Sequence, residues 1–123
     1  MPTTRILAVD DSRSMRALLR LTLKGGGFDV AEAEDGQAAL DWLETNEVDL
    51  IITDINMPRL DGFGFIERLR GEHRRHVGRP ILVLSTECTE EKKARGREAG
   101  ATGWIAKPFD PVQLVDAVRT AMH

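Results

Sequence analysis

Residues that would mark several other classes of protein are scarce in this chain of 123 residues. Cys88 is its one cysteine, which excludes an intramolecular disulfide framework and a zinc site built from several cysteines. No apolar run reaches the roughly 18 residues of a membrane-spanning helix, and residues 1–10 show no signal-peptide pattern. We therefore expect a soluble, cytoplasmic protein with no membrane partner.

Positive charge is also limited, because 17 Lys and Arg residues stand against 20 Asp and Glu residues and leave a net charge of −3. Nucleic-acid phosphates require clustered positive charge, so extensive nucleic-acid binding is not expected. No internal repeat, low-complexity tract or Pro/Ser-rich linker interrupts the sequence. We expect residues 1–123 to form a single compact domain.

Short apolar runs alternate with longer amphipathic stretches along the chain. Continuous runs, typical of strands buried on both faces, lie at 6–9, 50–52 and 81–84, with weaker candidates at 28–33 and 103–106. Apolar residues at helical spacing lie within 15–23, 39–43, 63–69 and 111–122. Glycines 25–27 should end the first helix, and Asp35 and Asp110 should cap the second and the last. The alternation predicts an α/β fold: a five-stranded parallel sheet, doubly wound as (βα)5, with helices on both faces.

The stretch 90–99 differs from the other expected helices, because Ala94 and Ala99 are its only apolar side chains. Gly96 in its middle costs about 0.5–1 kcal/mol relative to alanine. Two interpretations are open: a solvated helix held by its neighbours, or a loosely anchored element that shifts when a nearby site changes charge.

Polar residues follow the expected strands at the sheet edge where doubly wound folds bind ligands. Three carboxylates, two hydroxyls and one ammonium group should meet there: Asp10, Asp11, Asp54, Ser85, Thr86 and Lys107. At an effective dielectric of about 20, two carboxylates 4 Å apart repel by about 4 kcal/mol, so either their pKa values rise or a cation joins them. Oxygen ligands without His or Cys suit Mg²⁺. A metal ion, a carboxylate, a hydroxyl and an ammonium group are what phosphoryl transfer requires.

Each of these residues alone also has a purely structural interpretation. A single Asp at a strand end is often a helix cap or turn former, a lone Lys is often solvated, and a lone Ser often bonds to the backbone. Their joint placement on one sheet edge is what indicates function.

Five motifs extend the pattern over nearly the whole chain, from residue 5 to residue 122. They are Val-Asp-Asp-Ser at 9–12, Asp-Ile-Asn-Met-Pro at 54–58, Asp-Gly at 61–62, Leu-Ser-Thr-Glu at 84–87 and Trp-Ile-Ala-Lys-Pro-Phe at 104–109. Together they resemble response-regulator receiver domains of two-component systems, most closely the single-domain chemotaxis regulators. The resemblance implies a flavodoxin-like fold with strand order 2-1-3-4-5.

The resemblance also implies a reaction and a cofactor. Asp54 would accept a phosphoryl group from the phosphohistidine of a sensor histidine kinase. Asp11 and Asp54 would bind Mg²⁺ directly, Asp10 largely through water, and the backbone carbonyl of Asn56 would complete the protein ligands. The chain would then be a phosphoacceptor with its own phosphorylation and dephosphorylation chemistry, not a turnover enzyme.

Further roles follow from the same resemblance. Ser85 would turn toward the new phosphoryl group and Lys107, before a cis Lys107–Pro108 bond, would pair with it. Trp104 matches the family's aromatic switch position, although ordinary core or edge packing would also explain an indole there. Three further positions, Asn56, Thr86 and Glu87, would tune hydrolysis of the aspartyl phosphate and favour a short-lived signal.

The implied partners are a histidine kinase and a downstream target, either the flagellar motor switch or another signalling protein, bound by a monomer. The stretch 90–99 is more basic and less aliphatic than in chemotaxis regulators, which argues against the flagellar switch; its cations are Lys92, Lys93, Arg95 and Arg97. A phosphate sink or a phosphorelay intermediate are alternative roles.

Two other classes of protein share parts of the pattern. A phosphatase of the haloacid-dehalogenase type uses an Asp-x-Asp motif after its first strand and a cap domain, whereas Asp10 and Asp11 are adjacent. A flavin carrier of this fold needs a hydroxyl-rich loop after its first strand to bind the phosphate, whereas Asp10 and Asp11 in that loop would repel an anionic cofactor. His73 and His76 have metal-ligand spacing, but the adjacent arginines favour a solvated loop. No His or Asn arrangement supports catalysis by Cys88.

Overall fold

The computed structural model describes residues 3–72 and 78–122, in which strands and helices alternate. The elements are β1 (Arg5–Val9), α1 (Arg13–Gly25), β2 (Asp29–Ala33), α2 (Gly36–Leu43), β3 (Leu50–Thr53), α3 (Gly62–Glu72), β4 (Ile81–Ser85), α4 (Glu90–Ala99), β5 (Gly103–Ala106) and α5 (Pro111–Ala121). All pairings are parallel and the order is β2-β1-β3-β4-β5, which confirms the predicted sheet and its implied strand order. Among the described helices, none combines the length and apolarity needed to cross a membrane.

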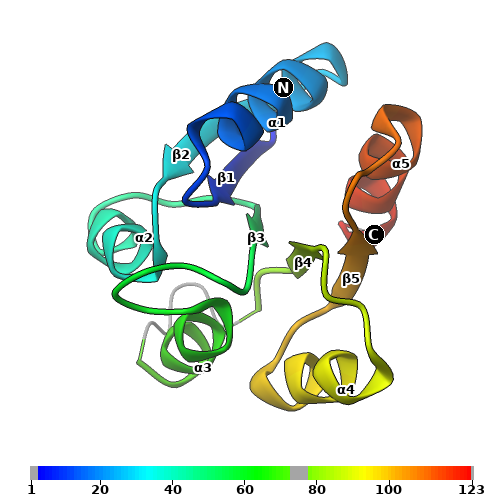
Figure 1. Cartoon of the computed structure of the whole chain (residues 1–123). Helices are drawn as coiled ribbons and strands as arrows, with labels where there is room; N and C mark the ends of the chain where they lie inside the picture. Colours follow the sequence, from blue (N-terminus) through cyan, green and yellow to red (C-terminus); the bar gives the residue numbers. More distant parts are fainter. Residues whose placement is uncertain (1–2, 73–77, 123) are drawn as a thin grey trace.

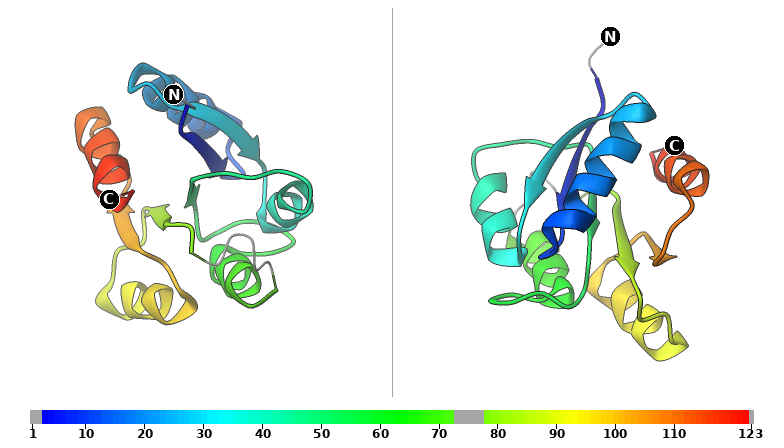
Figure 2. Two further views of the ribbon diagram at one scale, coloured as in Figure 1. Left: turned by 180° about the vertical axis from the view of Figure 1, so that it is seen from behind. Right: turned by 45° about the horizontal axis from the view of Figure 1, so that its top comes forward.

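The sheet is buried on both faces because successive strand residues point to opposite sides. Ile6 and Ala8 belong to a core with residues of α1 and α5, whereas Leu7 and Val9 belong to a second core with residues of α2 and α3. Figures 1 and 2 show the same division, with α1 and α5 on one side of the sheet and α2, α3 and α4 on the other. The short continuous apolar runs in the sequence are the consequence of this double burial.

Side-chain caps set the starts of the helices. Asp35 accepts a hydrogen bond from the N–H of Ala38 at 2.8 Å, and Asp110 caps α5 with Pro111 in its first turn, as predicted. Ser12 caps α1, which the sequence analysis did not identify. Because the strands are parallel, the connections in which these caps lie, and the polar residues within them, share one edge of the sheet.

The basic helix α4 docks on the rest of the fold with little burial of its own side chains. Within α4, all of which is described, Gly96 is the one buried residue. A Cβ atom at Gly96 would lie 2.7 Å from Cζ3 of Trp104, so the glycine provides room for the indole of β5. The guanidinium of Arg95 lies 4.2 Å from the ring centroid of Phe63, which is 6.3 Å from that of Trp104. Gly96, which in the sequence looked only like a cost to the helix, therefore lets α4 dock closely on Trp104.

A second anchor of α4 is the guanidinium of Arg70 in α3. Its Nε and Nη2 donate to the carbonyl of Gly100 at 3.1 and 2.9 Å, and its Nη1 donates to the carbonyl of Arg79 at 2.7 Å. Gly100, with φ of +118°, ends α4. Burial lowers the pKa of Arg70, but an arginine stays protonated in proteins, and the guanidinium therefore donates to these carbonyls as a cation.

Candidate functional site

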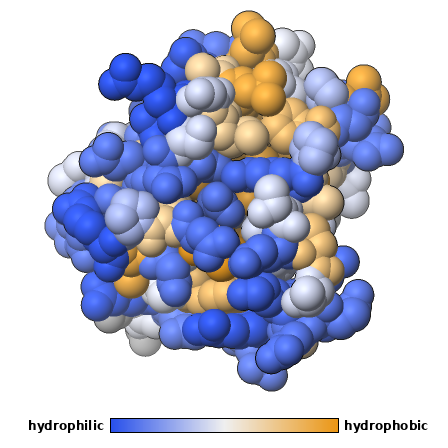
Figure 3. Space-filling view, viewed as in Figure 1, coloured by the Kyte–Doolittle hydropathy of each residue, from blue (hydrophilic) through white to orange (hydrophobic). Residues whose placement is uncertain are grey.

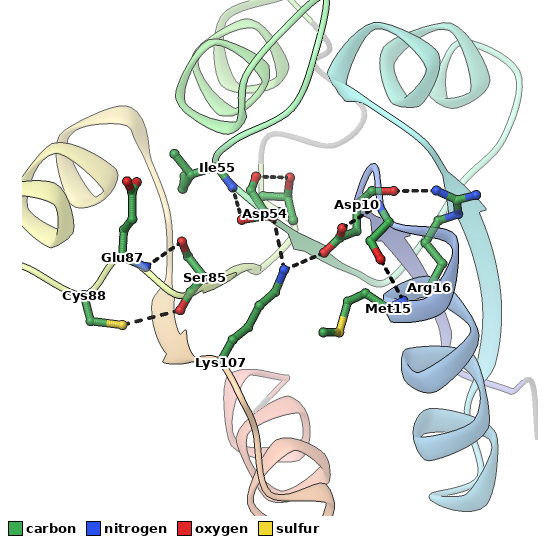
Figure 4. Close-up of polar contacts among 11 residues, drawn as sticks. Asp10, Met15, Arg16, Asp54, Ile55, Ser85, Glu87, Cys88 and Lys107 are labelled. Atoms are coloured by element: carbon green, nitrogen blue, oxygen red, sulfur yellow. Dashed lines mark hydrogen bonds and ion pairs between the residues drawn. The ribbon is translucent and has the colours of Figure 1, made fainter.

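The ends of β1, β3 and β5 bring acidic and basic side chains together (Figure 4). Asp10 directly follows β1 and Asp54 directly follows β3, and these strands are adjacent, with Val9 opposite Thr53. Asp11 completes a group, here called the acid cluster, in which one carboxylate oxygen of each Asp lies within 4.8 Å of the others. The face of the molecule seen in Figures 1 and 3 is hydrophilic across its middle.

Lys107 contacts two carboxylates of the acid cluster. Its Nζ lies 2.8 Å from Oδ2 of Asp10 and 3.1 Å from Oδ2 of Asp54. Burial alone would lower the pKa of Lys107, but the hydrogen bonds and charges of the two carboxylates outweigh it and raise that pKa above its ordinary value. Lys107 is therefore a cation at neutral pH. The peptide bond from Lys107 to Pro108 is cis, as implied by the resemblance.

Backbone groups fix the orientation of the carboxylates. Oδ1 of Asp10 accepts from the N–H of Ser12 at 2.9 Å, and the carbonyl of Asp10 accepts from Arg16 Nη1 at 2.7 Å. Oδ1 of Asp54 accepts from the N–H of Ile55 at 2.7 Å, which leaves Oδ2 on the side of Lys107. The roles of Ser12 and Arg16 were not predicted; in the sequence, their signal is only their position two and six residues after Asp10.

Ser85 lies at the neighbouring strand end, fully buried. Its hydroxyl accepts a hydrogen bond from the N–H of Glu87 at 3.1 Å, and its carbonyl accepts from Sγ of Cys88 at 3.5 Å. The carbonyl of Glu87 in turn accepts from Nε1 of Trp104 at 3.0 Å. The backbone of Glu87 therefore connects the hydroxyl at the end of β4 with the indole on which α4 packs.

The three other residues expected to tune the site lie around it. Asn56 and Thr86 are exposed, in the connections after β3 and β4. The carboxylate of Glu87 lies 3.3 Å from Nζ of Lys92 in α4, so it is turned toward a cation of that helix. His73 and His76 lie outside the described residues.

The acid cluster has the donor chemistry that a magnesium ion requires. Three carboxylates within 4.8 Å carry three negative charges, of which Lys107 offsets one, so a divalent cation would relieve the remaining repulsion. Carboxylate oxygens are hard ligands, and Mg²⁺ is commonly held by one or two of them together with water and phosphate oxygens. Asp10 is buried while Asp11 is exposed, so the cluster is both fixed and open to solvent. The residues present therefore fit Mg²⁺.

Comparison with protein families gives a match over residues 6–119 to the response regulator receiver domain. Among solved structures, the chain is similar to the chemotaxis protein CheY4 of Vibrio cholerae, with a TM-score of 0.93 and 40% identity, covering 98% of this chain and 99% of that one. It is also similar to the Francisella response regulator 1452 receiver domain, with a TM-score of 0.88 and 28% identity, covering 98% and 97% of the two chains. Both are neighbours of the same CheY-like fold.

Two curated relatives extend the comparison. The chain is 37% identical over 119 residues to the alkaline phosphatase synthesis transcriptional regulatory protein PhoP of Bacillus subtilis, covering 97% of this chain and 48% of PhoP. It is 37% identical over 121 residues to the response regulator MprA of Mycobacterium tuberculosis, covering 98% of this chain and 51% of MprA. The chain spans about half the length of these curated relatives.

Proposed function

The chain belongs to the response-regulator receiver family of two-component systems, and from this premise we propose that it receives a phosphoryl group on Asp54 from a sensor histidine kinase. The observation that carries the proposal is the position of Lys107, whose ammonium group contacts both Asp10 and Asp54. In this arrangement Lys107 can neutralise the oxygens of an incoming phosphoryl group, the other two acids can hold a divalent metal ion, and the Asp54 carboxylate can act as the nucleophile.

The proposed step is an in-line displacement. An oxygen of the Asp54 carboxylate forms a bond to phosphorus, the phosphorus–nitrogen bond of the donor phosphohistidine breaks, and the leaving nitrogen takes up a proton. The ammonium group of Lys107 neutralises charge on the phosphoryl oxygens. The three Asp residues of the acid cluster, with the backbone carbonyl of Asn56, would hold Mg²⁺, which when bound stabilises the negative charge of the phosphoryl group. The chain acts as a stoichiometric acceptor and not as a turnover enzyme.

We infer that the signal passes through residue 87 to β5. Phosphorylation adds about −1.5 to −2 charge and three acceptor oxygens at Asp54. The hydroxyl of Ser85 can donate to one of these oxygens. In the unphosphorylated protein this hydroxyl accepts a hydrogen bond from the N–H of Glu87, so its movement displaces the backbone of Glu87. Trp104 donates to the carbonyl of the same residue and packs on Gly96 of α4, so the change reaches β5 and α4, to which we assign the partner-binding face.

We further propose a chemotaxis-type role as a stand-alone, monomeric receiver domain in the cytoplasm. Its support is the likeness to Vibrio cholerae CheY4, which this chain matches over 99% of that chain. The downstream target is then the flagellar switch or another signalling protein. A domain that serves as a phosphate sink or relay needs no such target, so retention of one partner only by the beryllofluoride-treated protein would favour signal output.

Labelling with acetyl phosphate tests the acceptor assignment. Wild-type protein with Mg²⁺ should gain one phosphoryl group, and Asp54→Asn should gain none. Asp61→Asn is the matched control, because Asp61 is exposed in the loop before α3 and its side chain accepts a hydrogen bond from the N–H of Gly64, which an asparagine can also do, so this variant should label like the wild type. Stoichiometric labelling of Asp54→Asn would refute the assignment, and repeated hydrolysis of a generic phosphomonoester would instead favour a phosphatase.

A further inference from the structure

A bidentate ion pair joins the two connections that flank the acid cluster on the α2 side. Arg59, between β3 and α3, donates from Nε to Oδ2 of Asp35 at 2.8 Å and from Nη2 to Oδ1 at 3.1 Å. The Asp35 side chain is only 4% exposed, and it also caps α2 through the N–H of Ala38. One carboxylate thus holds both the start of α2 and the connection that follows Asp54.

The backbone of Arg59 shows that this connection is held in an unusual conformation. Its φ of +65° lies in the left-handed region, which non-glycine residues adopt rarely and retain where the surrounding contacts hold them. The next residue, Leu60, accepts a hydrogen bond from the N–H of Gly36 at 3.3 Å. A Cβ at Gly36 would lie 2.8 Å from that carbonyl, so the two connections are in close contact.

The pair is connected to the acid cluster from both sides. Asp35 lies two residues after Ala33, whose carbonyl accepts from the N–H of Asp10 at 3.1 Å. Arg59 lies three residues after Asn56, whose carbonyl is the expected fourth protein ligand. The hydrogen bonds and charge of Arg59 hold the pKa of Asp35 below its usual range, so the pair stays ionised at neutral pH.

We propose that Arg59, acting through Asp35, is a positioning residue for magnesium binding: the pair holds the connection after β3 against α2 so that Asn56 and the acid cluster are arranged before the metal arrives. Pre-arrangement of this kind raises affinity because less ordering remains to be done on binding. The inference rests on the proposed function, since it concerns the same site.

The test measures Mg²⁺ binding by calorimetry on the whole chain without a phosphodonor. Arg59→Asn removes the guanidinium but tolerates the left-handed backbone. Asp35→Asn removes the charge but keeps a side chain that caps helices well. Each variant should raise the half-saturating Mg²⁺ concentration about tenfold, the usual scale for a group that supports metal ligands. The double variant should be no worse than either single variant, because both remove the same contact.

The direction of the two changes separates positioning from simple electrostatics. If Arg59 acted only as a positive charge near the site, Arg59→Asn would tighten Mg²⁺ binding while Asp35→Asn would weaken it. Positioning predicts that both weaken it, and that Arg59→Lys, which keeps the charge but loses the fork, weakens it as well. In the metal-free variants, amide hydrogen exchange should accelerate in residues 56–60 and stay unchanged in β1 and β4. Unchanged exchange in these two strands also verifies that the variants are folded.

Three results would overturn the inference. They are an unchanged Mg²⁺ midpoint in both single variants, opposite changes in the two, or effects that add in the double variant. In each case wild-type protein would still bind Mg²⁺ and label on Asp54, so the proposed function would stand. Absence of Mg²⁺ binding and of labelling in the wild type would instead refute both.

Discussion

Replacing Gly96 by alanine is expected to destabilise the protein, although alanine favours helices. Gly96 lies in the middle of α4 with negative φ, so the substitution alone would stabilise a solvated helix by about 0.5–1 kcal/mol. The new methyl group, however, would lie 2.7 Å from Cζ3 and 3.1 Å from Cε3 of Trp104. The indole cannot move freely, because Nε1 is bonded to the carbonyl of Glu87 and the ring contacts Phe63.

The expected magnitude follows from these two opposing effects. Inserting a methylene-sized group into a packed site costs about 1–3 kcal/mol. After the helix preference is subtracted, the free energy of unfolding should fall by about 0.5–2 kcal/mol. For a domain of this size, that loss corresponds to a decrease in Tm of about 2–8 °C. If Trp104 moves outward to relieve the contact, its fluorescence should also shift toward that of an exposed indole.

Urea unfolding followed by circular dichroism measures the effect in four variants: Gly96→Ala, Gly71→Ala, Trp104→Ala and the Gly96→Ala/Trp104→Ala double variant. Gly71→Ala is the matched control, because Gly71 lies within α3 and a Cβ there would meet no atom of residues 3–72 or 78–122 within 4 Å; it should stabilise the protein by about 0.5–1 kcal/mol. In a Trp104→Ala background, Gly96→Ala should also become stabilising, since the clashing ring is gone. For the emission measurements alone, and only in variants that keep Trp104, the second tryptophan, Trp42, is changed to Phe so that emission reports on residue 104.

The result that would refute this reasoning is a Gly96→Ala variant as stable as, or more stable than, the wild type in the presence of Trp104. α4 would then have room for a side chain at residue 96, and Trp104 would not anchor it. The proposed route from Ser85 to the partner-binding face would lose its last step.

Mg²⁺ at millimolar concentration should raise the Tm of the wild type by mass action. Asp11→Ala should lose this rise in Tm, and in chelator it should be at least as stable as the wild type, because one of the repelling carboxylates is gone. An undiminished rise in the Tm of Asp11→Ala would exclude Asp11 as a ligand. Ser85→Ala should still be phosphorylated but lose the accompanying change in indole fluorescence, and a retained change would mean that the signal takes another route. Arg70→Ala should lower the free energy of unfolding by about 2 kcal/mol, because two hydrogen bonds from its charged guanidinium to the carbonyl of Gly100, which ends α4, are lost. Arg70→Lys should recover part of this loss, and an Arg70→Ala variant as stable as the wild type would contradict the anchor. Folding lowers the pKa of Asp35 from its ordinary value of 3.8, so the ionised Asp35 stabilises the fold fully above that pH and less as the pH falls below it. The difference in free energy of unfolding between wild type and Asp35→Asn should therefore shrink below pH 3.8. A difference that stays constant with pH would contradict a stabilising Arg59–Asp35 ion pair.

Much of the fold could be predicted from the sequence because its signals are local. Apolar runs at 6–9 and 81–84 reflect burial on both faces of a sheet, and the caps Asp35 and Asp110 act on N–H groups three residues away. The strand order was implied by the resemblance and not by periodicity, since pairing between strands leaves no local signal.

The Gly96–Trp104 and Arg59–Asp35 contacts, which the sequence did not reveal, depend on how separate elements pack against one another. The sequence predicted that Gly96 would weaken its helix, because the contact between Gly96 and Trp104 exists only once β5 packs on α4. Arg59 and Asp35 are separated by 24 residues, and nothing in a single sequence links them. The candidate site was more accessible to prediction, because its residues follow strands whose ends must meet at one edge of a parallel sheet.

The most direct test of the central claim locates the phosphoryl group itself. Wild-type protein is incubated with acetyl phosphate and Mg²⁺, the acyl phosphate is reduced with borohydride, and the peptides are sequenced by mass spectrometry. Reduction should convert Asp54 alone, and only when Mg²⁺ is present. Modification at Asp10 or Asp11 in place of Asp54, or no modification with Mg²⁺ present, would contradict the account.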